Sequence, residues 1–173
     1  MSDSWRLAMI LAVLLAAIGV LLHAIGVVTP GWSVYPPLKT AYGLWSQCAA
    51  SVCVSIVGSS FNTASYQACQ ALSIIGLLQG TTGVVVSGVH IVRSLMDKDT
   101  ITLLPKLSAA ACFASFTAIT ILIIVWGVDV HSTYEQAGFD VGYSAFLCIA
   151  GAVLLALGGG AMLCANRLDS QTF

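Results

Sequence analysis

Four long apolar runs without a charged side chain dominate this sequence and limit what it can fold into. They cover residues 7–28, 71–92, 107–128 and 141–165. Each run exceeds the roughly 20 residues with which an α-helix crosses a bilayer core. Only 8% of the residues are charged, against about 25% in ordinary soluble domains, which excludes a soluble fold. Because backbone groups in lipid must bond within their own segment, each run is predicted to be a membrane-spanning helix.

Basic residues orient these helices. One side of the membrane receives five of them, whereas the other side receives only Lys39. The five are Arg6, Arg93, Lys98, Lys106 and Arg167. The positive-inside rule therefore predicts that both termini are cytoplasmic. The chain is then a single four-span domain, whose connecting segments are an outer loop at 29–70, an inner loop at 93–106, a second outer loop at 129–140 and a tail at 166–173.

The first outer loop has the pattern of a small antiparallel sheet. "WSVY" is a run of β-formers after the turn signal "TPG", and two prolines end it. "YGLWSQ" and "VCVSIV" predict two further strands with "AAS" at the turn between them. In "SSFNTASYQACQAL" a Ser or Asn is expected to cap the second helix, which begins above the membrane surface. The sheet is expected to rest on the outer end of the helix bundle.

The six cysteines divide by position. Cys48 and Cys53 are predicted to form a disulfide across a tight hairpin, because opposed residues of antiparallel strands lie at disulfide distance and the outer side is oxidising. Cys69 can pair with either of them or stay free. Cys112 and Cys148 are expected to pack as small apolar side chains. Cys164 lies at the cytoplasmic end of the last span and is a candidate for palmitoylation, with simple packing as the alternative.

Polar side chains inside the spans are expected to serve the bundle itself. His23, Gln79 and His90 are predicted to form hydrogen bonds between helices. The glycines Gly76 and Gly80 are expected to let helices approach closely, as is the run 158–160. The sequence has no C-x-x-C pair and no evident catalytic or metal-binding set, and its net charge of −1 leaves no basic run for nucleic acid. We therefore expect no enzyme, no cofactor, no metal and no nucleic-acid partner.

The motifs "TPGW", "GLWSQC" and "VCV" together resemble the W–GLW–C–C signature of the claudin superfamily. That superfamily includes claudins, epithelial membrane proteins, peripheral myelin protein and channel γ subunits. "YQACQALSIIGLL", "TYEQAGFDVGY" and "LGGGAMLC" extend the resemblance over nearly the whole chain. It implies a membrane all-α, left-handed four-helix bundle with a small antiparallel sheet formed by the extracellular loops. The residues that match the signature are Trp32, Gly43, Leu44, Trp45, Cys48 and Cys53.

The chain departs from the usual claudin pattern in the outer loop. Ten residues separate Trp32 from Gly43, and four separate the two signature cysteines, so both intervals are shorter than in most claudins. Gln70 stands where claudins usually carry arginine, and no N-x-S/T glycosylation site occurs. The terminal "DSQTF" differs from the usual scaffold-binding ending. These departures favour a claudin-like protein with a trimmed sheet.

The resemblance implies a role at cell–cell junctions of the plasma membrane, in adhesion or a paracellular barrier. The expected partners are membrane lipids and either further copies or related claudin-like proteins, which associate side by side and across the gap between cells. The alternatives are an auxiliary subunit of a channel or receptor and a peripheral-myelin-type membrane organiser. Val54, just after the second cysteine, is uncharged, so we expect no strong ion selection.

Two groups of residues in the outer loops are assigned roles. Trp32 and Trp45 are expected to anchor the sheet at the lipid interface, where indoles are enriched, with direct contact to a partner as the alternative. In the acidic second outer loop, the candidate contacts between neighbouring molecules are Tyr134, Glu135 and Phe139.

Overall fold

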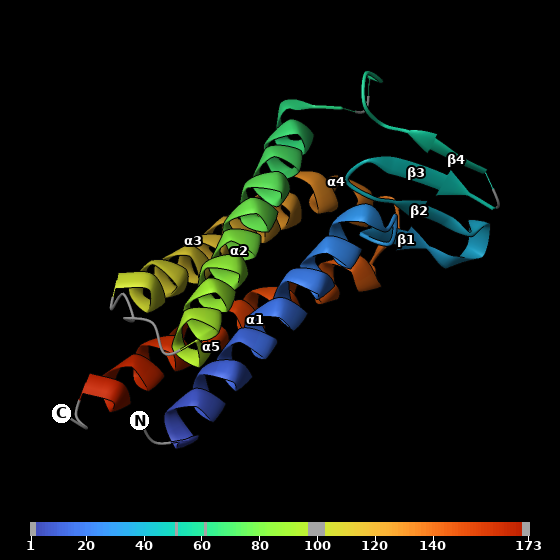
Figure 1. The fold of residues 1–173 in the computed structure, drawn as a ribbon. Coiled ribbons are helices and arrows are strands. Elements are labelled where there is room, and N and C mark those ends of the chain that lie inside the picture. Colours follow the sequence, from blue (N-terminus) through green and yellow to red (C-terminus); the bar gives the residue numbers. More distant parts are fainter. Residues whose placement is uncertain (1–2, 51, 61, 97–102, 171–173) are drawn as a thin grey trace.

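The computed structural model describes residues 3–50, 52–60, 62–96 and 103–170. Four long helices run side by side and a small sheet covers one end of them (Figure 1). The elements in chain order are α1 (Asp3–Val28), β1 (Ser33–Tyr35), the 3-10 turn η1 (Pro36–Leu38), β2 (Thr40–Tyr42), β3 (Ser46–Ala49), β4 (Val52–Ser55), α2 (Ala64–Leu95), α3 (Leu103–Val125), the π-helical segment η2 (Trp126–His131), α4 (Ser132–Glu135), β5 (Asp140–Val141) and α5 (Tyr143–Ser170).

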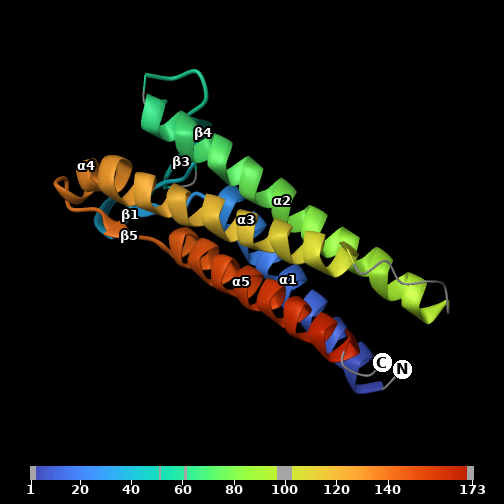
Figure 2. The same cartoon turned by 90° about the vertical axis from the view of Figure 1, so that its left-hand side faces the viewer.

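The helices form two close pairs. α1 packs most extensively against α5, and α2 packs against α3 (Figures 1 and 2). α3 also lies along α5 and closes the bundle. Both termini lie at the end opposite to the sheet. Of the orientation residues, Lys98 lies outside the described residues, as do positions 171–173 of the tail.

Side-chain size shows that lipid surrounds these helices. The exposed face of α1 carries large apolar residues at helical spacing, namely Leu7, Leu11, Leu14, Ile18, Leu21 and Ile25. Its buried face carries mainly small or polar ones, including Ala12, Ala16, Gly19, His23 and Gly26. A water-soluble helix has the opposite distribution, whereas helices in lipid meet through small residues. The described residues contain four helices long and apolar enough to span a membrane, and the protein is a multi-pass membrane protein of the predicted fold class.

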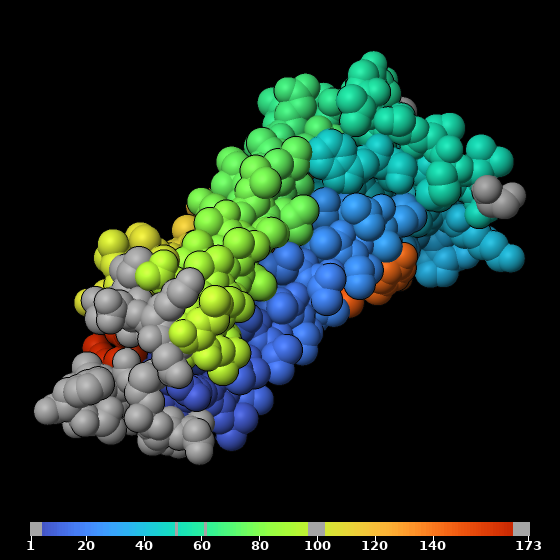
Figure 3. Space-filling view, viewed as in Figure 1, coloured from blue at the N-terminus to red at the C-terminus, as the bar shows by residue number. Residues whose placement is uncertain are grey.

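The sheet has five antiparallel strands in the order β4-β3-β2-β1-β5. Its register is set by the pairs Tyr42 with Ser33, Ala41 with Cys48, and Val34 with Asp140. β5 comes from the second outer loop, so both loops build the sheet. The space-filling view shows the β3–β4 side projecting beyond the helix ends (Figure 3).

Three local predictions need correction. "YGLWSQ" is not one strand, because Tyr42 ends β2 and β3 begins only at Ser46, after a tight turn closed by a bond from the Gly43 amide to the Ser46 carbonyl (2.8 Å). The α2 cap is Thr63, whose hydroxyl accepts from the Tyr66 amide. The third helix does not give way to a loop at residue 129, since η2 and α4 continue it to Glu135.

Candidate interaction surface on the outer sheet

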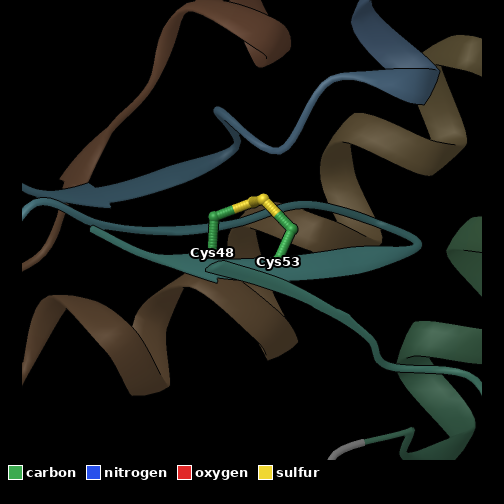
Figure 4. The surroundings of a disulfide bond; sticks show 2 residues. All are labelled: Cys48 and Cys53. Atoms are coloured by element: carbon green, nitrogen blue, oxygen red, sulfur yellow. A yellow bond between two sulfur atoms is a disulfide. The ribbon is translucent and has the colours of Figure 1, made fainter. Parts of the chain in front are cut away.

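The hairpin of β3 and β4 is closed by the predicted disulfide (Figure 4). Cys48 and Cys53 stand directly opposite each other, with their Cα atoms 4.0 Å apart. The turn between the strands begins at Ala50, which has φ 54° and so lies in the left-handed region. The alternative pairings fail, because Cys69 is a buried free thiol whose sulfur lies 3.9 Å from the Leu122 carbonyl oxygen. A covalent bond thus fixes the register of a hairpin only four residues per strand long.

The Gly-Leu-Trp segment joins the sheet to the helix bundle. A Cβ at Gly43 would lie 2.7 Å from the Pro30 Cα, so only glycine fits where the chain passes the end of α1. Leu44 is fully buried, and its carbonyl accepts a 2.7 Å hydrogen bond from Nε2 of Gln70 on α2. Trp45 is only half-buried and packs on the edge of the core. The unusual Gln70 therefore satisfies a buried backbone carbonyl of the signature segment.

The Trp32 side chain is buried in the protein and does not face lipid, which corrects the expectation for this residue. Its side chain is 1% exposed, and its Nε1–H donates a 2.8 Å hydrogen bond to the carbonyl of Gly26 near the end of α1. The ring meets Trp126 edge-on at 5.2 Å between centroids. The end of α1 supplies the acceptor that an indole needs when buried, and this favours the interior.

A second polar contact joins β1 to the end of the third helix. The hydroxyl of Ser33 lies 2.9 Å from Nδ1 of His131, and both side chains are buried. The His131 ring stacks on Trp126 at 4.8 Å. Sequence reasoning missed this pair. Helical periodicity continuing from Trp126 through His131 was the available signal, but the apolar run ends at residue 128, where a loop was expected.

Tyr134 and Phe139 are half-buried and pack against the sheet. Tyr134 lies 4.6 Å from the Tyr42 ring, and Phe139 lies 5.1 Å from the Tyr35 ring. The Tyr66 hydroxyl donates to that of Tyr134 at 3.1 Å. Both tyrosines lie beyond the apolar runs, and burial raises the pKa of each hydroxyl. Glu135, the third residue of the predicted contact group, is exposed, and a contact with a neighbouring molecule stays a prediction for all three residues.

The exposed edge of the sheet is β4 together with Val57, here named the β4 edge. Val52 is 65%, Val54 49% and Val57 55% exposed. Val52 and Val54 alternate with Cys53, so they project from the face opposite to the disulfide. No described strand pairs with the outer side of β4. Backbone donors and acceptors therefore stand unpaired beside exposed valines, which is the arrangement of a sheet edge ready for a partner.

Inside the spans, His23 makes the predicted polar contact between helices, whereas the buried Oε1 of Gln79 has no hydrogen-bond partner among the described residues. Nε2 of His23 lies 3.2 Å from the Ser73 carbonyl oxygen, and the ring of His90 meets that of Trp5 edge-on at 5.8 Å. Gly76 and Gly80 face side chains of neighbouring helices of the same molecule. Among the described residues, no three His, Cys, Asp or Glu side chains form a set that could hold a metal ion.

The remaining cysteines differ in access. Cys112 and Cys148 are buried in the core as expected, whereas Cys164 is exposed on α5 near the end that carries the termini. Its exposure leaves the thiol accessible, and palmitoylation of Cys164 stays a prediction.

The family described as "Tight junction protein, Claudin-like" matches residues 1–167. A search of curated proteins gives no match.

Proposed function

The chain belongs to the claudin-like family of tight junction proteins, and from that premise we propose that it seals or holds together contacts between neighbouring cells. It acts by assembly, in which the outer sheets of several copies, or of related claudin-like proteins, associate side by side and across the intercellular gap. Its place is then the plasma membrane at cell–cell junctions, with both termini in the cytoplasm.

The β4 edge is the observation that supports this proposal most. An isolated monomer leaves three valines and one row of backbone groups of β4 uncovered on its outer surface. Soluble surfaces usually protect such an edge with lysine, proline or a bulge, and none of these occurs in β4 itself. Pairing with another extended strand would satisfy the backbone groups and bury the valines together.

The charge of this surface favours a barrier over an ion path. Lys39 is the only charged residue between positions 29 and 70. Ion pores that select by charge are lined with rings of charged side chains. A β4 edge made of valine, cysteine and serine offers no such ring.

To test this proposal, the protein is expressed alone in cells that lack junctions, and the contacts between cells are examined by freeze-fracture. We expect intramembrane strands for the wild type and for Gln136→Lys, which adds one charge to the exposed second outer loop. Val52→Lys/Val54→Lys places charge on the β4 edge and is expected to abolish strands while the protein still reaches the surface.

Two outcomes would contradict the proposal. Strands that persist in the double lysine variant would remove the β4 edge from the assembly. If the wild type forms no strands and co-purifies with a channel or receptor, an auxiliary-subunit role replaces the junction role.

A further inference from the structure

A small pocket lies between the first turns of α1 and the last turns of α2, at the end that carries both termini. Its volume is about 10 Å³, which is close to the space that a single water-sized group occupies. The walls combine the polar residues Trp5, Arg6 and Ser94 with apolar side chains such as Met9 and Ile91.

Two of the polar atoms lining this pocket are buried without a partner. Trp5 and Ser94 are each 3% exposed. Neither Nε1 of Trp5 nor Oγ of Ser94 has a hydrogen-bond partner among the described residues. Most buried polar groups in native proteins are bonded, so two orphans at one pocket indicate that something else occupies it. The edge-on contact with His90 holds the Trp5 ring on this side of α2.

The two unpartnered groups define what the occupant must offer. An indole N–H can only donate, and a hydroxyl can donate. The complementary group is an oxygen that accepts both bonds. The two termini and the inner loop together carry five basic and four acidic residues, so the net charge on this side of the bundle is small. Recognition of the ligand would therefore depend on the buried donors.

The position of the pocket identifies the source of that oxygen. Trp5 and Arg6 immediately precede the apolar run 7–28, and Ser94 follows the run 71–92. This is the level of the lipid headgroups, where tryptophan and arginine are enriched. Outside the pocket, the exposed apolar side chains of Ile10 and Leu95 suit the glycerol and upper acyl carbons of a lipid, whereas a free hydrated anion would gain nothing from them.

We propose that this pocket binds one phosphate oxygen of a phospholipid headgroup, in the leaflet on the side of the termini, with the Trp5 indole and the Ser94 hydroxyl as donors. Arg6 adds a positive charge at the same pocket. The site makes no use of the outer sheet, so it stands apart from the proposed junction role.

The test observes Trp5 directly by ¹⁹F NMR of 5-fluorotryptophan-labelled protein in a phosphate-free detergent. The chain has four tryptophans, and Trp5→Phe assigns the resonance. Phosphatidylserine is titrated into the micelles, with a galactolipid that lacks phosphate and inorganic phosphate as parallel arms. We expect a saturable shift of the Trp5 resonance with phosphatidylserine only, and an apparent affinity reduced about 5- to 10-fold by Ser94→Ala, as the loss of one hydrogen bond implies.

The matched control is Ser73→Ala, because the buried Ser73 hydroxyl of the same helix already bonds the Gln70 carbonyl and its loss should leave the titration unchanged. The proposal fails if phosphatidylserine leaves the Trp5 resonance in place, which would make a water molecule the occupant. It fails equally if inorganic phosphate shifts the resonance as strongly, if the galactolipid does so, or if Ser94→Ala titrates like the wild type.

Discussion

The two ends of this molecule are held together by different means. In the bundle, α1 and α5 touch through glycine, so that a Cβ at Gly151 would lie 2.7 Å from the carbonyl oxygen of Gly19. In the outer sheet, a disulfide, buried side-chain hydrogen bonds and contacts between aromatic rings hold the structure together. Lipid removes the hydrophobic drive between helices, so close packing has to supply their attraction. The sheet faces water and is too small to hold itself, so covalent and polar bonds supplement its core.

The largest effect is expected where α1 and α5 cross. Gly151→Val forces a side chain against the α1 backbone, and we expect a loss of about 3 kcal/mol or more, at the upper end of overpacking costs. The measure is the fraction of monodisperse protein in detergent together with its thermal unfolding. Gly160→Val makes the same change where nothing lies within 4 Å of a Cβ. Equal damage in both variants would show that close packing is not what joins α1 to α5.

Removing the disulfide should affect the sheet and spare the bundle. For Cys48→Ser/Cys53→Ser we expect a loss of about 2 kcal/mol, as the chain-entropy model gives for so short a loop. Hydrogen exchange should accelerate in β3 and β4 and remain unchanged in the buried turns of α2. The matched control is Cys112→Ser/Cys148→Ser, which alters two buried thiols of the bundle instead. Faster exchange throughout the helices of Cys48→Ser/Cys53→Ser would contradict the claim that the sheet and the bundle are stabilised independently.

The bond between Gln70 and Leu44 is where the two ends meet. Gln70→Leu leaves the buried Leu44 carbonyl without its donor, and we expect a cost of about 1–2 kcal/mol. Gln67→Leu, one turn earlier and exposed, should cost far less. Thermal unfolding of the two variants side by side measures the difference, and equal midpoints would show that the Gln70 bond adds nothing to the junction of sheet and bundle.

The smallest expected effect concerns the Tyr66–Tyr134 hydrogen bond. Tyr134→Phe should cost about 1 kcal/mol near pH 8. Since burial raises the pKa of both hydroxyls, their contribution is complete below the unfolded pKa of about 10 and is lost as the pH rises above it. The difference in stability between the wild type and Tyr134→Phe should therefore become smaller as the pH rises. Thermal unfolding of both proteins from pH 8 to pH 11 measures it. A difference in stability that grows with pH would contradict the raised pKa of the two hydroxyls. As the control, Tyr143→Phe alters an exposed side chain and should have the same stability as the wild type.

The sequence sufficed for the four spans, the existence of the sheet and the cysteine pairing, because span length, β-former runs and cysteine position are local signals. It failed where contact with another helix or strand determines the conformation of a residue. Nothing local shows that Trp32 turns inward to the Gly26 carbonyl, or that Gly43 interrupts a strand because Pro30 lies against it. The continuation of α3 to Glu135 likewise depends on packing of Trp126 and His131 beneath the sheet.

The pairing of α1 with α5, repeated outside the membrane by β1 with β5, has a consequence for synthesis. Within these residues α1 precedes every other element, and its main partner α5 is made after all of them. Until then its small-residue face stays open to lipid or to a foreign helix. A chain truncated before α5 would therefore leave that face of α1 without its main partner.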